Sequence, residues 1–232
     1  MSVLTDGLVE AAQLLISLDR EVLEIAARTL QVTVTATLIS VLIGIPVGTL
    51  LALKRFLGRG FMVSLVNFGM GLPPVVVGLG TWLLLTRYGP LGTLGLLYTP
   101  TAMVIAQAVI ASPIVAGFSL AAIQAVPGKI HLQILSLGAT RIQYILLLLW
   151  EARLGILAAV IAGFGGVISE VGASMMVGGN VRGYTRVLTT ATVLEVSKGR
   201  FELATALSII LLVLTFGIVA VLSYLQQRRR SA

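Results

Sequence analysis

The chain of 232 residues is 57% hydrophobic and 11% charged, and its mean hydropathy is +1.04. A soluble protein of 24.4 kDa leaves too much surface exposed to hide so many apolar side chains, which excludes an ordinary soluble domain. The net charge of +7 does not indicate nucleic-acid binding, because the basic residues form short clusters between apolar runs. The composition therefore predicts an all-α integral membrane protein.

Residues 1–28 precede the first apolar run and carry most of the acidic side chains. Apolar residues recur there at helical spacing. We expect an extracytoplasmic amphipathic helix, either lying along the membrane surface or forming a solvated terminal helix. The first residues lack the basic region that opens a cleaved signal peptide, so the spans themselves are expected to drive insertion.

About five apolar segments are long enough to cross a bilayer, since ~25 helical residues reach ~37 Å. They form one expected transmembrane domain over 29–225, with spans at 29–53, 61–85, 100–123, 153–177 and 201–225. Residues 124–152 hold too many polar groups for a clean span, so we predict two short helices broken near Gly138. Residues 226–232 form a basic tail.

The short loops predict the orientation, because loops rich in Lys and Arg stay in the cytoplasm. Loop 54–60, the region 124–153 and the terminal residues are basic with a single acid, Glu151. On the other side, basic and acidic residues balance. We predict a multi-pass protein of the cell (plasma or inner) membrane with its N-terminus outside and its C-terminus in the cytoplasm.

Proline residues predict a break inside the second span. Pro73 and Pro74 have no backbone N–H to donate, so the helix must kink or unwind there. Freed carbonyls at membrane depth are tolerated only against protein or a water-filled cavity, which places the break on a pathway. A packing kink without substrate contact fits either proline equally well. Pro113, inside the third span, is a further pore or gate candidate.

Glu170 is a charged residue within the otherwise apolar fourth span. A charge near the bilayer centre costs at least ~2.5–3.5 kcal/mol on insertion scales, so it should face the bundle interior with a partner. We expect an arginine or the small-residue run 163–166 as that partner. A structural or gating role is predicted for Glu170 with its neighbours Ser169 and Gly172.

The segment around Gly138 has the form of a docking element on the basic side. Glycine permits a sharp turn between two short helices, and exposed polar residues can meet a partner beside an apolar face. A plain interfacial helix is the alternative, and physical reasoning alone prefers it. The candidate contact residues are Gln133, Ile134, Leu137, Gly138, Ala139 and Arg141.

This segment resembles the EAA loop of ABC-transporter type-1 permeases, whose pattern is Glu-Ala-Ala, three residues, then Gly. Leu132-Gln133-Ile134 stands where the Glu-Ala-Ala is found, and Gly138 matches the glycine. The glutamate and two later prolines of the pattern are replaced in this chain, the second proline by Leu154. The distance of the motif from the C-terminus agrees with the family.

Other segments are similar to the molybdate, tungstate and sulfate permeases of that family. Residues 168–173 and 177–186 resemble their fourth span and the loop after it, and 71–78 resembles their second span. Segments 89–95 and 99–107 look most like the tungstate branch. The resemblance implies the ABC type-1 permease fold and a permease subunit of an ATP-driven oxyanion importer, tungstate first, with molybdate or sulfate as the alternative.

The resemblance also implies a homodimer, a cytoplasmic ABC ATPase dimer that holds ATP-Mg, and an extracytoplasmic substrate-binding protein. The sequence has no G-x-x-x-x-G-K-[ST] motif, so another chain is expected to hydrolyse ATP and this one is not an enzyme. With no cysteine and one histidine, no metal site is expected.

Three residues after the fourth span are assigned to the extracytoplasmic mouth or to the binding-protein contact: Asn180, Arg182 and Arg186. Direct oxyanion binding by ionised Glu170 is not expected, because like charges repel. Two alternatives come from other classes. One is an autonomous channel or secondary carrier, although such carriers usually show internal repeats that we do not find here. The other is an assembly subunit that transports nothing.

Overall fold

The protein is described by a computed structural model that covers residues 5–6, 8–9, 12–13 and 19–228. Within those residues all regular secondary structure is helical, which confirms the predicted all-α class. Parts of the predicted N-terminal segment and of the basic tail lie outside the described residues.

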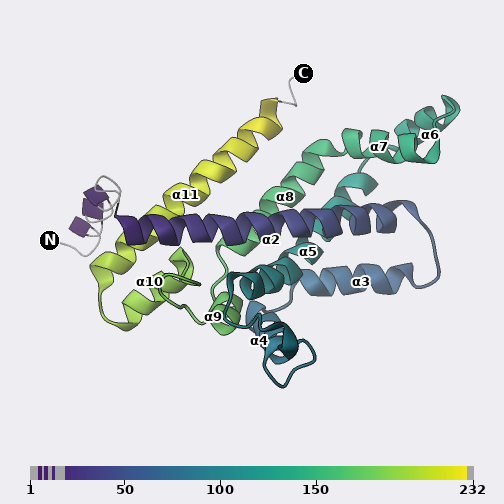
Figure 1. Ribbon diagram of the computed structural model, residues 1–232. Coiled ribbons are helices and arrows are strands. Elements are labelled where there is room, and N and C mark those ends of the chain that lie inside the picture. The colour runs from purple at the N-terminus through teal and green to yellow at the C-terminus, as the bar shows by residue number, and fades with distance from the viewer. Residues whose placement is uncertain (1–4, 7, 10–11, 14–18, 229–232) are drawn as a thin grey trace.

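Helices α2 (Arg20–Leu53) and α5 (Pro100–Gln124) form the centre of the bundle (Figure 1). Small residues bring the two backbones together. A Cβ added at Gly48 would lie 2.5 Å from the carbonyl oxygen of Ala116 and 2.9 Å from the backbone nitrogen of Leu120. Because a membrane offers little hydrophobic drive for association, this close van der Waals packing is what holds the helices together.

The second apolar segment is broken at its prolines, as predicted. Helix α3 (Arg59–Met70) ends before the two prolines, and α4 (Pro74–Leu85) begins at the second of them. The first N–H groups of a helix have no partner within it, so a proline at this position costs no helical hydrogen bond. The two helices are bent by 101°. The predicted kink at Pro73-Pro74 is therefore confirmed.

The region between the third and fourth spans also follows the expectation. Helix α6 (Gly128–Ser136) and helix α7 (Arg141–Glu151) are separated by a turn in which Gly138 has φ +74°. Only glycine adopts this left-handed conformation without strain. The predicted break near Gly138 is confirmed.

Two helix boundaries were not anticipated from the sequence. Helix α2 begins earlier than expected, because the Asp19 carboxylate caps it by accepting a 3.0 Å hydrogen bond from the N–H of Val22. The apolar segment 153–177 is interrupted, and forms α8 (Arg153–Ile168) and α9 (Gly172–Gly178). The cause of this interruption lies in the contacts of Glu170, described below.

The remaining described elements are the short helix η1 (Gly92–Leu94), α10 (Leu188–Ser197) and α11 (Phe201–Arg228). In Figure 1, α6 and α7 lie at one end of α2, which we call the α7 end, and α10 lies toward the other, the α10 end. Loop 54–58 also lies at the α7 end, where its neighbour Arg59 donates from Nε to the carbonyl of Leu51 (2.7 Å).

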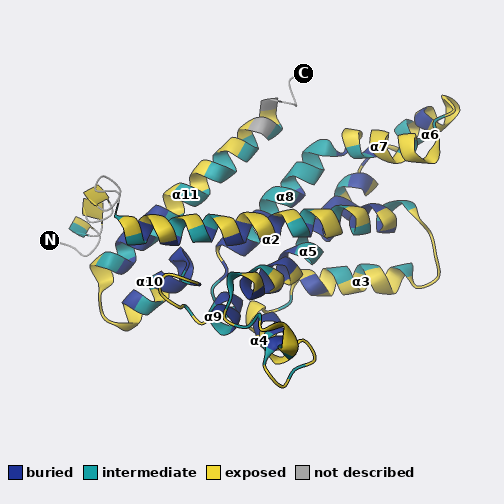
Figure 2. Ribbon diagram, in the orientation of Figure 1, coloured by how far each residue is buried: buried dark blue, intermediate teal, exposed yellow. Residues whose placement is uncertain are grey.

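Among the described residues, helices α2, α5 and α11 are individually long and apolar enough to cross a membrane. The bent pairs α3–α4 and α7–α8 raise the number of candidate spans to as many as five. Only 17% of the most apolar stretch of α11 is buried within the chain. Its exposed apolar surface, visible in Figure 2, requires lipid or another subunit as its neighbour.

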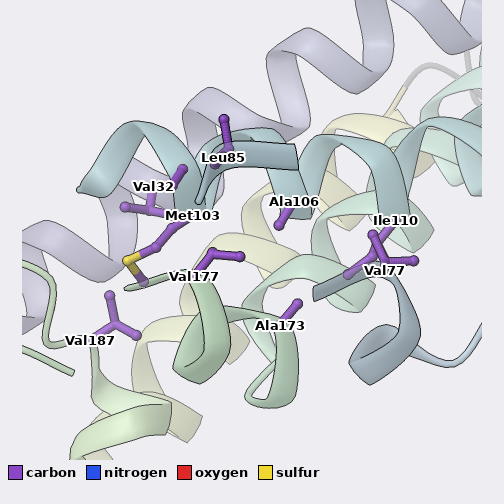
Figure 3. Packing of buried hydrophobic residues seen from close by; sticks show 10 residues of the cluster. Val32, Val77, Leu85, Met103, Ala106, Ile110, Ala173, Val177 and Val187 are labelled. Atoms are coloured by element: carbon purple, nitrogen blue, oxygen red, sulfur yellow. The ribbon is translucent and has the colours of Figure 1, made fainter. Parts of the chain in front are cut away.

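The largest buried cluster lies where α4, α5 and α9 meet. Met103 and Ala106 of α5, Val77 of α4 and Ala173 and Val177 of α9 converge there (Figure 3). Each is at most 8% exposed. The broken helices are thus packed on the central helix and form part of the core.

We predict that Gly48→Val destabilises the protein. The added side chain must overlap the backbone of α5, and overpacking of this kind costs about 1–3 kcal/mol. Thermal unfolding in detergent should show a lower midpoint for this variant. Gly217→Ala is the matched control, since a Cβ there meets nothing within 4 Å, and an unchanged midpoint in both variants would contradict the prediction.

Candidate functional site

The turn between α6 and α7 is held in one conformation by side chains on both sides of it. The Thr140 backbone N–H donates to Gln143 Oε1 (2.8 Å), and the Gln143 N–H donates to Thr140 Oγ1 (3.4 Å). This reciprocal capping box fixes the start of α7. Across the turn, His131 Nδ1 and the Tyr144 hydroxyl lie 2.7 Å apart, which joins α6 to α7.

The α6–α7 hairpin is also anchored to the bundle. Ile134 and Leu148 are buried with Ile123, Val126 and Ala152, which come from the end of α5 and the start of α8. The hairpin is therefore packed onto the end of the central helix and onto the start of α8.

The structure places most of the predicted contact residues on the surface of this hairpin, with one exception. Gln133, Leu137, Gly138 and Arg141 are exposed, and Ala139 is partly buried, whereas Ile134 is 8% exposed and faces the core. The exposed apolar face comprises Leu132, Leu135, Leu137 and Ile142. Sequence reasoning missed Leu132 and Ile142. Each lies between two polar residues in a short helix, and this neighbourhood was a usable sign that the apolar side chain is exposed.

Glu170 occupies the break between α8 and α9. Its side chain is buried, with a residue exposure of 5%. Oε1 accepts from the N–H of Ala173 (2.6 Å), and Oε2 accepts from the N–H (3.0 Å) and the hydroxyl (2.9 Å) of Ser174. The carboxylate thus satisfies the free donors at the start of α9, where the helix dipole also favours negative charge.

This finding corrects the expected partners of Glu170. No arginine pairs with it among the described residues, and the run 163–166 is not what it caps. The prediction that it faces the interior with a partner is confirmed, but the partner is the next helix. Because the side chain returns to backbone N–H groups three and four residues ahead, the chain must leave α8 and start a new helix.

Hydrogen bonds extend from Glu170 to two other helices. Gln107 on α5 donates from Nε2 to Ser174 Oγ (3.0 Å), and Thr189 on α10 donates to the backbone carbonyl of Glu170 (3.2 Å). Gln107 is 3% exposed, and its Oε1 has no partner among the described residues. We call Gln107, Glu170, Ser174 and Thr189 the Glu170 cluster. Sequence reasoning missed Gln107 and Ser174, although a glutamine inside an apolar span was a usable signal.

The other gate candidates, Gly172, Pro113 and Ser169, have different contacts. Gly172 lies against α4, since a Cβ there would be 2.8 Å from Val75 Cγ2, so it joins the Glu170 cluster to the helix that begins at Pro74. Pro113 instead contacts Gly69 of α3, where an added Cβ would lie 2.7 Å from the proline ring. Ser169 is exposed and donates within its own turn to the Gly165 carbonyl (2.8 Å).

The residues predicted at the mouth form a charged cluster at the α10 end. Arg182 Nε donates to Glu21 Oε1 (2.8 Å), its Nη2 pairs with Oε2, and Arg186 Nη1 lies 3.5 Å from Oε1. Arg186 Nε also donates to Asn180 Oδ1 (3.3 Å). Hydrogen bonding to Glu21 and its opposite charge raise the pKa of Arg182 above its ordinary value, so the guanidinium is charged at neutral pH.

This cluster shows that the two arginines have an acidic partner that the loop sequence does not reveal. Glu21 comes from the start of α2, far along the chain, and it partly neutralises them. A second arginine contact ties the same parts together, because Arg28 Nη2 donates to the Gly183 carbonyl (2.9 Å). Within the described part of the chain, no group of three or more His, Cys, Asp or Glu residues is placed to hold a metal ion.

Comparison with known structures shows the fold. An amino acid ABC transporter solved with histidines matches with a TM-score of 0.67 at 24% identity, over 92% of this chain and 96% of that one. An inward-facing MetNI methionine ABC transporter matches with a TM-score of 0.70 at 21% identity, over 91% and 95%. The expected ABC permease fold is confirmed.

Comparison with curated proteins gives relatives of higher identity. A probable anion ABC transporter permease protein of Haloferax volcanii is 41% identical over 201 residues, covering 84% of this chain and 87% of the relative. The tungstate uptake system permease protein TupB of Peptoclostridium acidaminophilum is 37% identical over 227 residues, covering 98% and 100%.

The comparison with family models agrees with the fold and with these relatives. Residues 44–231 match the family described as binding-protein-dependent transport system inner membrane component. The matched range contains the α6–α7 hairpin, the Glu170 cluster and most of the described spans. The chain therefore belongs to this family of ABC transporter permeases.

Proposed function

We propose that this chain is the permease subunit of an ATP-driven importer of oxyanions, and that tungstate is its first substrate. The observation that carries the proposal is the tungstate permease relative, which is similar over 98% of this chain and 100% of its own length. Molybdate is the second candidate, since relatives named as molybdenum permeases match at 33% and 28% identity. Tungstate ranks first because its relatives are more similar to this chain.

The proposed assembly is a homodimer of this chain with two copies of a cytoplasmic ATPase and an extracytoplasmic binding protein. The sequence lacks a P-loop, so ATP-Mg belongs to the ATPase. Exposed apolar side chains on α4, among them Val75, Val76 and Leu79, supply a face for the second copy. The charged cluster around Arg182 and Arg186 is assigned to the mouth or to contact with the binding protein.

The proposed orientation puts the α7 end in the cytoplasm and the α10 end outside. The α7 end carries the basic loop 54–58, Arg141 and Arg153, as the positive-inside rule requires of cytoplasmic loops. The exposed face of the α6–α7 hairpin then meets the ATPase. The exposed leucines of the hairpin are proposed to enter an apolar groove of the ATPase. Gln133 and Arg141 then supply polar contacts at the rim of that groove.

The hairpin is proposed to work as a coupling helix. Since Ile134 and Leu148 pack against the ends of α5 and α8, displacement of the hairpin by the ATPase moves both helices. Helix α5 carries Gln107, and α8 leads directly into Glu170. Motion at the cytoplasmic face thus reaches the Glu170 cluster through continuous helices.

The Glu170 cluster is proposed to position the gate without binding substrate. The carboxylate has its hydrogen-bonding capacity engaged by α9, and its charge repels an oxyanion. It holds α9 against α4 at the position where Gly172 contacts Val75. The broken helices α4 and α9 therefore move as one unit when α5 and α8 shift.

The substrate assignment predicts the behaviour of cells that lack this chain. Deletion of its gene should reduce accumulation of radiolabelled tungstate, supplied at trace concentration, to the level of energy-depleted cells. Excess unlabelled molybdate should compete less effectively than excess tungstate in wild-type cells. Tungstate uptake that persists after ATP depletion would instead favour a secondary carrier, and unchanged uptake in the deletion strain would contradict the proposal.

The coupling role predicts that Gly138→Val abolishes uptake while the protein still inserts in the membrane. A β-branched residue at φ +74° is strained by about 1–3 kcal/mol, so the turn must change and α6 must be displaced. Tungstate uptake and membrane content are measured together. Gly128→Ala is the matched control, because a Cβ there meets nothing within 4 Å.

Two results would refute the coupling role. One is wild-type uptake by Gly138→Val. The other is labelling of Ser136→Cys, the sole cysteine of that variant, by an impermeant reagent added outside intact cells, because it would place the hairpin on the outer face.

The positioning role predicts uncoupling in Glu170→Gln. The amide nitrogen of glutamine cannot accept from the N–H groups of Ala173 or Ser174, and leaving a buried donor unpaired costs about 1–3 kcal/mol. Uptake per ATP hydrolysed should fall below the wild-type ratio in the reconstituted transporter. Ser197→Ala, an exposed residue of α10 whose hydroxyl bonds within its own turn, should keep that ratio. A lower protein yield with a wild-type ratio would show a purely structural role.

A further inference from the structure

The α7 end carries an open apolar groove that the transport mechanism does not use. It has a volume of about 490 Å³ and lies between α2, α7 and α8. Its lining is aliphatic apart from Trp150 and Arg153, which lie where α7 meets α8. The lining includes Ile45, Leu146, Leu149, Leu154, Leu157 and Val160.

Trp150 and Arg153 contact each other in two ways where α7 meets α8. The Arg153 guanidinium carbon lies 5.0 Å from the centroid of the indole ring, and Nη1 donates to the Trp150 carbonyl (2.9 Å). Trp150 is 62% exposed. Tryptophan beside a cation at the end of an apolar helix is typical of the interface between lipid tails and headgroups.

The positive charge of Arg153 is not neutralised by a carboxylate. None of the ion pairs formed by the described residues includes it. Its near neighbour Glu151 lines a different hollow, together with Ala122 and Pro127 on the other side of the helix. The lining of the groove therefore contains one cation that forms no ion pair with the described residues.

The polar end of α11 reaches the same place. Gln226 donates from Nε2 to the carbonyl of Leu154, which lines the groove, at 2.9 Å. The cation Arg153 therefore lies beside an apolar channel, and the complementary partner is an anion with an apolar tail.

We propose that this groove binds an anionic phospholipid of the leaflet at the α7 end. The acyl chain lies along the leucines of α7 and α8, where the seven helical steps from Arg153 to Val160 rise by about 10 Å. The headgroup phosphate accepts from the free donors of Arg153. On the orientation proposed above this is the cytoplasmic leaflet, whose anionic lipids attract basic groups near the membrane surface.

The consequence concerns the bend between α7 and α8. The two helices are inclined by 69° at Ala152, between Trp150 and Arg153. A lipid that contacts both helices stabilises this one angle, and with it the position of the α6–α7 hairpin. Lipid composition is thereby linked to coupling.

Native mass spectrometry of the purified full-length chain, in the assembly in which it is extracted, tests the proposal. Phosphatidylglycerol and phosphatidylcholine of equal chain length are titrated separately. We expect tighter binding of phosphatidylglycerol, and a loss of about five-fold in that preference for Arg153→Gln, the effect of one basic group near a membrane surface. Arg55→Gln is the matched control, an exposed arginine at the same end of the molecule but away from the groove.

A second variant distinguishes the contribution of the apolar groove to lipid binding from the contribution of the Arg153 charge. Leu157→Trp narrows the groove and should weaken both lipids, whereas Arg153→Gln should affect only the anionic one. Equal affinity of the wild type for both lipids would overturn the proposal. So would an equal loss in Arg55→Gln, or an assembly in which a second copy covers the groove and no lipid binds. Because binding is read directly, these outcomes do not depend on whether the chain transports an oxyanion.

Discussion

The structure depends on how one carboxylate is accommodated inside an apolar bundle. Glu170 is 5% exposed, and burial of an unpaired charge would cost more than the fold can tolerate. Three hydrogen bonds from Ala173 and Ser174 satisfy it, and they exist only because the chain leaves α8 and begins α9. The interrupted fourth span follows directly from this requirement.

The same requirement determines what lies around α9. Once this short helix has started, Gly172 and Ala173 fit against α4, which can approach because Gly78 has no side chain. Gln107 reaches Ser174 from α5, and Thr189 reaches the Glu170 backbone from α10. Two broken helices, one made by prolines and one by a carboxylate, therefore pack on each other beside the central helix. Irregular backbone at membrane depth is tolerated when protein surrounds it in this way.

The two ends of the molecule are organised differently. At the α7 end, an apolar cluster packs the α6–α7 hairpin against the ends of α5 and α8, which is the contact that the proposed coupling role requires. At the α10 end, the loop after α9 is attached to the start of α2 by ion pairs with Glu21 and by Arg28. The Arg182–Glu21 pair is exposed and screened by salt, so it orients the loop more than it stabilises the fold.

Several features that a local rule controls could be predicted from the sequence. Hydropathy identified the membrane class, Pro73 and Pro74 placed one break, and Gly138 placed the turn of the hairpin, because a missing N–H or a missing Cβ acts on its own backbone wherever it stands. The order of short motifs was enough to identify the permease family. Apart from Glu170, the residues that face inward could not be identified from the sequence, because packing between the helices determines which side of each one is buried. Helix α5 is apolar on all sides, so its pattern does not single out the face that carries Gln107, and Ile134 could not be distinguished from its exposed neighbours. The pairing of Glu21 with Arg182 joins residues 161 positions apart, and such a contact exists only when packing has brought the start of α2 and the loop after α9 together.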